Sequence, residues 1–182
     1  MSGDVVDLIM QDHREVERLF DELKQHPDKR PLLVPVLASI LTAHSRAEEA
    51  EVYPAAKKAG EEDEVEHSQH EHAEAEELLA KLVETDPESP DFEPALDELV
   101  ESVTHHVEEE ESSVLPGMRE RLDDARREEL GRAFAASRAK HMGDMPGQAT
   151  LAELRQQAAN MGVSGASSMS KEQLRRELSH SS

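Results

Sequence analysis

Apolar residues recur every three or four positions along most of this chain, which is the period of helices that bury one face. The same period predicts helices over residues 32–58, 61–84 and 123–140, and a further one from Leu96 to Val114. The proline-containing segments "HPDKRP" and "TDPESPDFEP" are expected to interrupt the helices. In residues 3–25 the apolar stripe passes through Val6, Ile9, His13, Val16, Phe20 and Leu23.

These elements predict an all-α fold. Short connections between long helices favour an antiparallel up-down-up-down four-helix bundle. We expect the helix over residues 123–140 to dock outside this bundle as a fifth, flanking helix, so that residues 1–140 form one domain.

The chain changes character after residue 140. Residues 141–149 contain Gly, Met and Pro and predict a linker. Residues 150–182 predict a small helix-turn-helix module, with a first helix closed by Gly162 and a second helix capped by Ser170. Acidic and basic side chains nearly balance in this module, whereas acidic side chains dominate the rest of the chain.

Histidine placement carries the clearest chemical signal. Four of the ten histidines lie on the apolar stripes, and two glutamates each follow a stripe histidine by four residues. Antiparallel packing would bring these side chains to a similar height in the bundle interior: His13, His44, Glu48, His72, His106 and Glu110. The remaining histidines fall in turns, off the stripes or outside the bundle, and we expect them in solvent: His26, His67, His70, His105, His141 and His180.

An internal repeat relates the two halves of the bundle. The stretch "HSRAEEAEVYP" matches "HVEEEESSVLP" in its His, Glu and Pro positions, and "DHREVERLFDEL" matches "EHAEAEELLAKL". Each half therefore supplies a His, and then a His and a Glu, to a site with twofold pseudosymmetry. The last helix has an alternative register, His105 with Glu109, although the stripe and the spacing to Pro116 favour His106 with Glu110.

Composition restricts the chemistry of such a site. The chain has no cysteine, which excludes disulfides, thiolate zinc sites, cysteine-ligated iron–sulfur clusters and covalently attached haem c. A formal net charge of −21 favours cations and disfavours nucleic acid as a partner of the bundle. For the C-terminal module, both a weak nucleic-acid role and a protein-contact role stay open. No export signal or membrane-length apolar run is present, so we expect a cytoplasmic protein without a membrane partner.

Six donors exceed the needs of one tetrahedral zinc ion. Two bridging carboxylates and two imidazoles per ion would give each of two ions four protein donors, and an oxo or hydroxo bridge would add a fifth. An ion that prefers six ligands then keeps a position for O₂, hydrogen peroxide, NO or water. Iron is the first candidate and manganese the second. Mutual ion pairing among the six side chains is the alternative without metal.

These residues resemble the hemerythrin-like HHE cation-binding domains, whose pattern is a His, a His-x-x-x-Glu, a His and a second His-x-x-x-Glu on four bundled helices. The resemblance covers about residues 3–118. It implies a non-haem di-iron centre with the four stripe histidines as terminal ligands and Glu48 and Glu110 as bridges. Oxygen-carrying hemerythrins have a further His one turn before the third-helix ligand, where this chain has Ser68. The resemblance therefore favours reactions of peroxide, NO or O₂, sensing, or iron handling over oxygen transport.

The C-terminal module resembles the small SAP-like N-terminal module of the Rho transcription terminator. Two functions are accordingly predicted as alternatives. The chain is either a di-iron protein that binds or turns over O₂, peroxide or NO, for example as a catalase-like stress enzyme, or an iron- or redox-responsive protein that acts through its C-terminal module.

Overall fold

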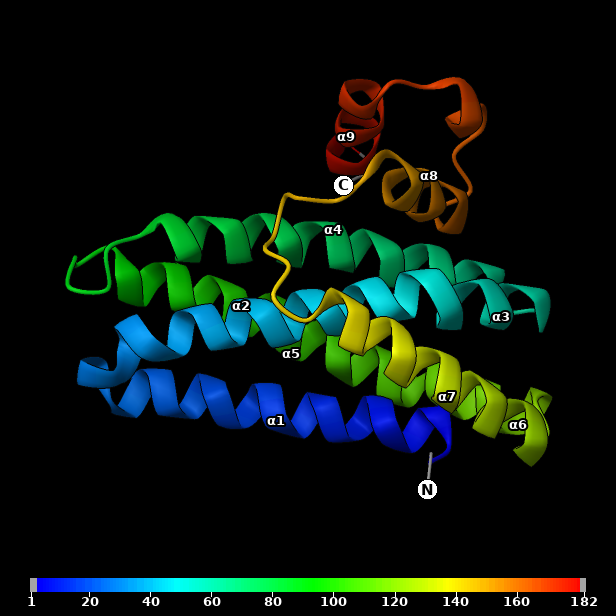
Figure 1. Ribbon diagram of the computed structural model, residues 1–182, viewed down its shortest axis with the longest axis horizontal. Coiled ribbons are helices and arrows are strands. Elements are labelled where there is room, and N and C mark those ends of the chain that lie inside the picture. Colours follow the sequence, from blue (N-terminus) through cyan, green and yellow to red (C-terminus); the bar gives the residue numbers. More distant parts are fainter. Residues whose placement is uncertain (1–2, 181–182) are drawn as a thin grey trace.

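The computed structural model describes residues 3–180, and all regular structure in that range is helical. The bundle helices are α1 (Val5–Gln25), α2 (Arg30–Ala47), α4 (Glu62–Glu84) and α5 (Phe92–Ser112). They lie side by side and alternate in direction, which confirms the predicted all-α bundle (Figure 1). They pack in the ring order α1, α2, α4, α5, and α5 closes the ring against α1.

The first predicted break lies where proline requires it. A 3₁₀ turn at Pro27–Lys29 (η1) separates α1 from α2. Pro31 occupies the first turn of α2, where a missing N–H costs no helical hydrogen bond. At the other end of α1, Asp4 caps the helix by accepting a hydrogen bond from the N–H of Val6 at 2.9 Å.

The second helix changes its winding beside the predicted site. Residues Glu48–Val52 (η2) form a π-helix between α2 and α3 (Tyr53–Lys58), and the N–H of Tyr53 donates to the carbonyl of Glu48. Pro54 follows directly and has no N–H to donate to the carbonyl four residues earlier, which favours a wider turn here. The wide turn brings Glu48 and Tyr53 onto one face, whereas five α-helical residues would separate them by roughly 140°.

The equivalent helix of the second half breaks instead of bulging. Helix α5 ends at Ser112, and after Ser113 the chain continues as α6 (Val114–Arg121), with Pro116 in its first turn. Pro54 and Pro116, which the repeat aligns, therefore both mark a departure from regular winding just beyond the site. The physical response differs between the two halves.

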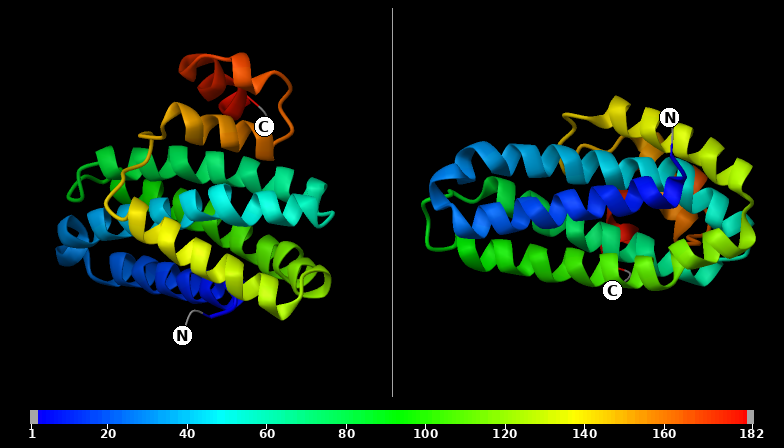
Figure 2. Two further views of the ribbon diagram at one scale, coloured as in Figure 1. Left: turned by 45° about the vertical axis from the view of Figure 1, so that its right-hand side comes forward. Right: turned by 90° about the horizontal axis from the view of Figure 1, so that it is seen from below.

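The predicted flanking helix is α7 (Asp124–His141). It lies on the outside of the bundle along α1 and α2 and also contacts η2 (Figure 2). Its Phe134 side chain is fully buried against the bundle. His141, at the end of this helix, is buried and not in solvent as expected, because the following turn folds back and places Asp144 Oδ2 2.9 Å from its Nδ1.

A small C-terminal unit packs on α4 (Figure 1). It consists of α8 (Leu151–Asn160), a 3₁₀ turn η3 (Ala166–Ser168) and α9 (Lys171–His180). Ser170 caps α9 by accepting a hydrogen bond from the N–H of Gln173 at 3.2 Å. Helix α8 also contacts η2 and α3, so this unit reaches the segment where the second bundle helix changes its winding.

Two apolar clusters fill the bundle and lie on either side of a polar layer. One includes Leu19, Leu37 and Leu99, and the other includes Ile9, Val65 and Phe134. His13 follows Ile9 by four residues on α1, so the polar layer begins where the second cluster ends. Among residues 3–180, no helix combines the length and apolar character that a membrane crossing requires.

Candidate metal centre

The six predicted side chains, called the inner donors below, meet in the polar layer between the two apolar clusters. All are buried: the imidazoles are 3–6% exposed and both carboxylates are 0% exposed. Every bundle helix contributes to the group, with His13 from α1, His44 from α2, Glu48 from the start of η2, His72 from α4, and His106 and Glu110 from α5.

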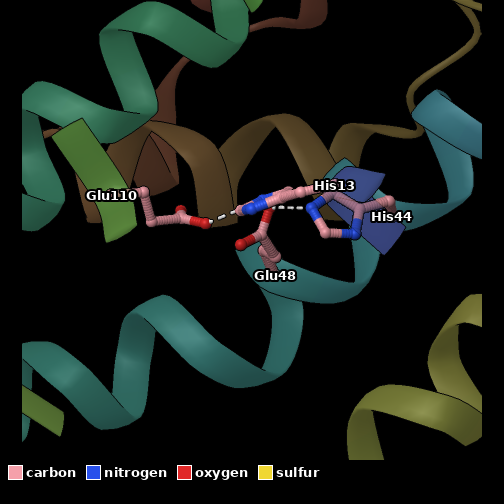
Figure 3. A group of neighbouring side chains, drawn as sticks. All are labelled: His13, His44, Glu48 and Glu110. Carbon is pink, nitrogen blue, oxygen red and sulfur yellow. Dashed lines mark ion pairs between the residues drawn. The ribbon is translucent and has the colours of Figure 1, made fainter. Parts of the chain in front are cut away.

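The inner donors form two groups that share both carboxylates. His13 and His44 join Glu48 and Glu110 in the first group (Figure 3), and His72 and His106 join them in the second. Within each group, one donor atom from each residue lies within 4.8 Å of all the others.

Each of the two shared carboxylates contacts one imidazole of the first group and one imidazole of the second. Glu48 Oε1 is 2.8 Å from His44 Nε2 and 3.3 Å from His72 Nε2. Glu110 Oε1 is 3.3 Å from His13 Nε2, and its Oε2 is 3.5 Å from His106 Nε2. Bridging ligands of a two-ion centre would have this arrangement.

Each inner imidazole also contacts a carboxylate through its other ring nitrogen. These supporting carboxylates lie at Nδ1–oxygen distances of 2.9 Å for His13 with Glu111, 2.9 Å for His44 with Asp12, 3.3 Å for His72 with Glu49 and 3.6 Å for His106 with Glu71. An Nδ1–H that faces a carboxylate leaves Nε2 available for a metal, and metal-bound histidines almost always have such a partner.

The supporting carboxylates follow a closed pattern around the bundle. Each one is next in sequence to an inner donor of its own helix, yet it contacts the imidazole of the next helix in the ring. The contacts therefore run from α1 to α2, from η2 (which continues α2) to α4, from α4 to α5 and from α5 back to α1.

Charged neighbours outweigh the effect of burial on the protonation of the inner donors. Burial alone would lower the pKa of an imidazole, but the charge of Glu48 and hydrogen bonds to Asp12 and Glu48 raise the pKa of His44 to about 10. Against the same effect of burial, hydrogen bonds and charges of Glu48 and Glu49 raise the pKa of His72 to about 10. Burial alone would raise the pKa of Glu48, but His44 and His72 hold it well below its usual range. Metal binding would therefore displace protons from these histidines.

The hydrogen bonding of the inner donors tests whether a metal fits. Among residues 3–180, His13 Nε2, His44 Nε2 and both oxygens of Glu48 are buried without a well-aligned hydrogen bond. In mutual ion pairing these atoms lie close to oppositely charged groups, as His44 Nε2 and Glu48 Oε1 do at 2.8 Å, but they meet at poor hydrogen-bond angles, which weakens the contacts. Imidazole nitrogens and carboxylate oxygens that face a common centre suit divalent transition cations. The donor set therefore fits metal better than it fits ion pairing alone.

Besides the four supporting carboxylates, sequence reasoning missed a further polar group at the centre, the hydroxyl of Tyr53. This hydroxyl donates to Glu110 Oε2 at 2.8 Å and lies 2.9 Å from His72 Nε2. Tyr53 is the only tyrosine of the chain and is fully buried. Burial and the nearby charges of Glu110 and Glu48 raise its pKa well above the usual value, so the phenol keeps its proton.

The alternative register of α5 lies outside the centre. His105 is exposed and Glu109 is half-buried, whereas His106 and Glu110 point inward. Of the other histidines that we expected in solvent, His67 is exposed, and His26 and His70 are half-buried. The side chain of His180 lies outside the described residues.

Comparison with known proteins agrees with this geometry. The profile of the Hemerythrin HHE cation binding domain matches residues 4–117, a range that contains all six inner donors. The chain belongs to this family. Its hemerythrin-like domain extends from the cap of α1 into α6, and α7 and the C-terminal unit follow the matched range.

Two relatives are similar over most of the chain. A protein of Nostoc sp. named DNA nickase is 30% identical over 148 residues, which cover 80% of this chain and 42% of that protein. An uncharacterized hemerythrin-like protein of Schizosaccharomyces pombe is 33% identical over 125 residues, which cover 66% of this chain and 62% of that protein. The chain thus spans less than two thirds of the length of either relative. No solved structure matches the chain significantly.

The two donor groups of the hemerythrin-like domain are not equivalent. The first group has both of its supporting carboxylates at 2.9 Å, whereas the second has them at 3.3 and 3.6 Å. The second group also has the Tyr53 hydroxyl beside it. Ser68, one turn before His72, is buried at 2% exposure and offers a hydroxyl where oxygen-carrying hemerythrins offer an imidazole.

Proposed function

We propose that the hemerythrin-like domain holds two iron ions between its six inner donors and uses them to bind or react with O₂, hydrogen peroxide or NO. The observation that carries this proposal is the pair of four-donor groups that share Glu48 and Glu110. Four protein donors per ion are fewer than iron prefers, which leaves room for a small ligand. Two iron ions, when bound, would supply electrons and Lewis acidity to such a ligand.

The residues of the chain would control the proton and water content of the site. Tyr53 holds a proton on its buried hydroxyl beside His72, where it could be donated to a small oxygen- or nitrogen-containing ligand. The apolar clusters on both sides exclude bulk water, which strengthens each electrostatic contact inside the layer. The supporting carboxylates hold the imidazoles in one orientation and tautomer. These features suit consumption of peroxide or NO better than release of unchanged O₂.

Iron loading tests this proposal directly. Wild-type protein supplied with Fe²⁺ should retain two iron ions per chain, develop visible absorption that changes on addition of peroxide, and consume peroxide or NO. The double variant Glu48→Ala/Glu110→Ala should retain no iron, because both bridging carboxylates are removed. His70→Ala is the control, because His70 is a half-buried imidazole of α4 outside both donor groups.

Two results would count against the proposal. Equal iron content in the wild type and the double variant would place the iron elsewhere. An iron-loaded protein whose spectrum does not respond to O₂, peroxide or NO would remove the reactive role and leave iron storage. Helical content measured by circular dichroism separates loss of the site from loss of the fold.

A second candidate is sensing through the C-terminal unit, and one contact favours it. The Nδ2 of Asn160, at the end of α8, donates to the backbone carbonyl of Glu49 at 3.0 Å and to Gln69 Oε1 at 3.2 Å. Glu49 lies in the π-helix beside the bridging Glu48, and its carboxylate contacts His72. A change in metal state that moves η2 would therefore also displace the end of α8, through the hydrogen bond of Asn160. Because this unit resembles the N-terminal module of Rho, it would be the part of the chain that binds a partner.

Hydrogen exchange distinguishes the two candidates. In a sensor, amide exchange in α8 and α9 should differ between iron-loaded and metal-free protein, and Asn160→Ala should reduce that difference. If exchange in α8 and α9 is identical in both states, the metal does not act through this unit. Peroxide or NO consumption that is unchanged in Asn160→Ala would then leave the first candidate alone.

The name of the Nostoc relative raises a third activity, DNA nicking. The net charge of −21 repels a DNA backbone, and the inner donors are too deeply buried to meet a phosphate. We therefore expect that supercoiled plasmid stays supercoiled with the iron-loaded protein. Conversion to open circles by the wild type, but not by Glu48→Ala/Glu110→Ala, would reverse this expectation.

A further inference from the structure

A second cluster of metal-ligating side chains lies on the outer surface of α4 and α5. This surface cluster consists of His67 and Glu71 on α4 and His105 and Glu109 on α5, and one donor atom from each lies within 4.8 Å of the others. His67 Nε2 is 3.1 Å from Glu71 Oε1 and 2.5 Å from Glu109 Oε2. His105 Nε2 is 3.3 Å from Glu109 Oε1.

The arrangement follows from helix geometry. On each helix a His precedes a Glu by four residues, which places both side chains on one face. Because α4 and α5 are antiparallel neighbours, the His of each helix lies opposite the Glu of the other. Three of the four residues directly precede an inner donor in the sequence: Glu71 before His72, His105 before His106 and Glu109 before Glu110. One residue corresponds to about 100° of rotation around the helix, so these side chains point away from the inner centre.

Glu71 supplies an independent indication of a ligand. Its side chain is 9% exposed, and neither of its oxygens has a well-aligned hydrogen bond among residues 3–180. One oxygen faces His67 in the surface cluster, and the other is 3.6 Å from His106 Nδ1 of the inner centre. A buried carboxylate that lacks hydrogen bonds is costly unless a cation lies beside it.

The cluster is open to hydrated ions. A hollow of about 490 Å³ on one side is lined by His67, Glu71 and His105 of the cluster, and also by His70 and by Leu178 of α9. A second hollow, of about 740 Å³, is also lined by Glu71 and His105. Its other acidic residues concentrate cations near the cluster: Glu74, Glu98, Glu101 and Glu108.

We propose that the surface cluster binds one divalent transition-metal ion of the zinc class. Two imidazole nitrogens and two carboxylate oxygens are a complete tetrahedral donor set for Zn²⁺, whereas Mg²⁺ and Ca²⁺ prefer oxygen ligands alone. The bound ion would share Glu71 with the inner centre. The proposal concerns residues other than the inner donors, so it does not depend on iron binding by the inner centre.

Zinc binding by the full chain tests this site. Wild type, pre-loaded with iron, is dialysed against Zn²⁺ in physiological salt with excess Mg²⁺, and the bound zinc is then counted. His67→Ala/His105→Ala should bind one zinc ion fewer than the wild type. The side chains of His67 and His105 are 57% and 60% exposed, so their removal leaves the core intact. The control His26→Ala removes an imidazole that belongs neither to the surface cluster nor to the lining of either hollow, and it should bind zinc as the wild type does.

Cobalt gives a second readout, because tetrahedral Co²⁺ absorbs far more strongly in the visible range than octahedral Co²⁺. The difference spectrum between the wild type and His67→Ala/His105→Ala should show the strong visible absorption of tetrahedral Co²⁺. Glu109→Gln should weaken this absorption. Equal zinc content in the wild type and His67→Ala/His105→Ala would overturn the proposal, and so would an equal loss of zinc in His26→Ala. Iron content, measured in the same samples, reports separately on the inner centre.

Discussion

Replacing Asp12 by Asn should weaken one of the two inner donor groups and spare the other. Asp12 Oδ2 lies 2.9 Å from His44 Nδ1, and Arg138 contacts its other oxygen. Asn keeps the shape and can still accept the Nδ1–H, but it removes the negative charge that makes His44 a stronger donor. Loss of such a partner typically costs 10- to 100-fold in metal affinity, or about 1.4–2.8 kcal/mol. His44 belongs to the first group alone, so the ion held with His72 and His106 should keep most of its affinity.

Stepwise chelation measures this difference. Iron-loaded protein is titrated with a competing chelator, and the iron that remains per chain is counted at each step. In Asp12→Asn, one iron ion should leave at a chelator concentration about 10- to 100-fold lower than in the wild type. Asp21→Asn is the matched control, because it makes the same change at an exposed position of α1. Unchanged titrations, or an equal shift of both ions, would refute the idea that each supporting carboxylate serves one donor group.

Three further predictions concern residues around the centre. Phe134→Ala should lower the free energy of unfolding by about 3–5 kcal/mol in urea titrations, because a fully buried ring that packs against His44 is lost. An unchanged urea midpoint would mean that α7 does not stabilise the bundle. Tyr53→Phe should retain iron yet consume peroxide about 100-fold more slowly, because the ring stays buried while the proton donor is removed; an unchanged rate would exclude Tyr53 from the chemistry. Burial raises the pKa of Glu61 to about 7 from 4.5, so folding favours its neutral form. Its contribution to stability is present below pH 4.5 and is lost as pH rises through 7, so urea midpoints should fall over that window in the wild type and fall less in Glu61→Gln.

The helices and the inner donors could be predicted because both follow regular helical periodicity. His13, His72 and His106 continue apolar stripes of 3.6-residue period, and regular helices hold them at one height. The choice between His105 and His106 also follows from the stripe, because a shift of one residue turns a side chain by about 100°. The structure places these residues together, and their role as ligands stays a prediction until metal is measured.

Other groups at the centre could not be found by periodicity. Tyr53 is five residues from Glu48, a spacing that regular α-helix turns away and that only the π-helix brings inward. Asp12 and Glu71 could not be recognised from the pattern of their own helices, because each contacts an imidazole of a different helix. Contacts between helices depend on packing angle and axial offset, which the pattern of one helix does not specify. An acidic residue directly beside four of the six inner donors, namely His13, Glu48, His72 and Glu110, is the sequence signal that could have identified the supporting carboxylates.

The closed ring of supporting carboxylates makes the metal centre a property of the assembled bundle. Asp12 and His13 are neighbours on α1, but Asp12 supports a histidine of α2, and His13 is supported by Glu111 of α5. No single helix, and neither half of the internal repeat, can therefore present a complete donor group with its supporting partners. A metal that binds only the folded state would stabilise it in proportion to its affinity. Because each contact in the ring joins two different helices, that stabilisation would be distributed over all four helix interfaces and would not be confined to one.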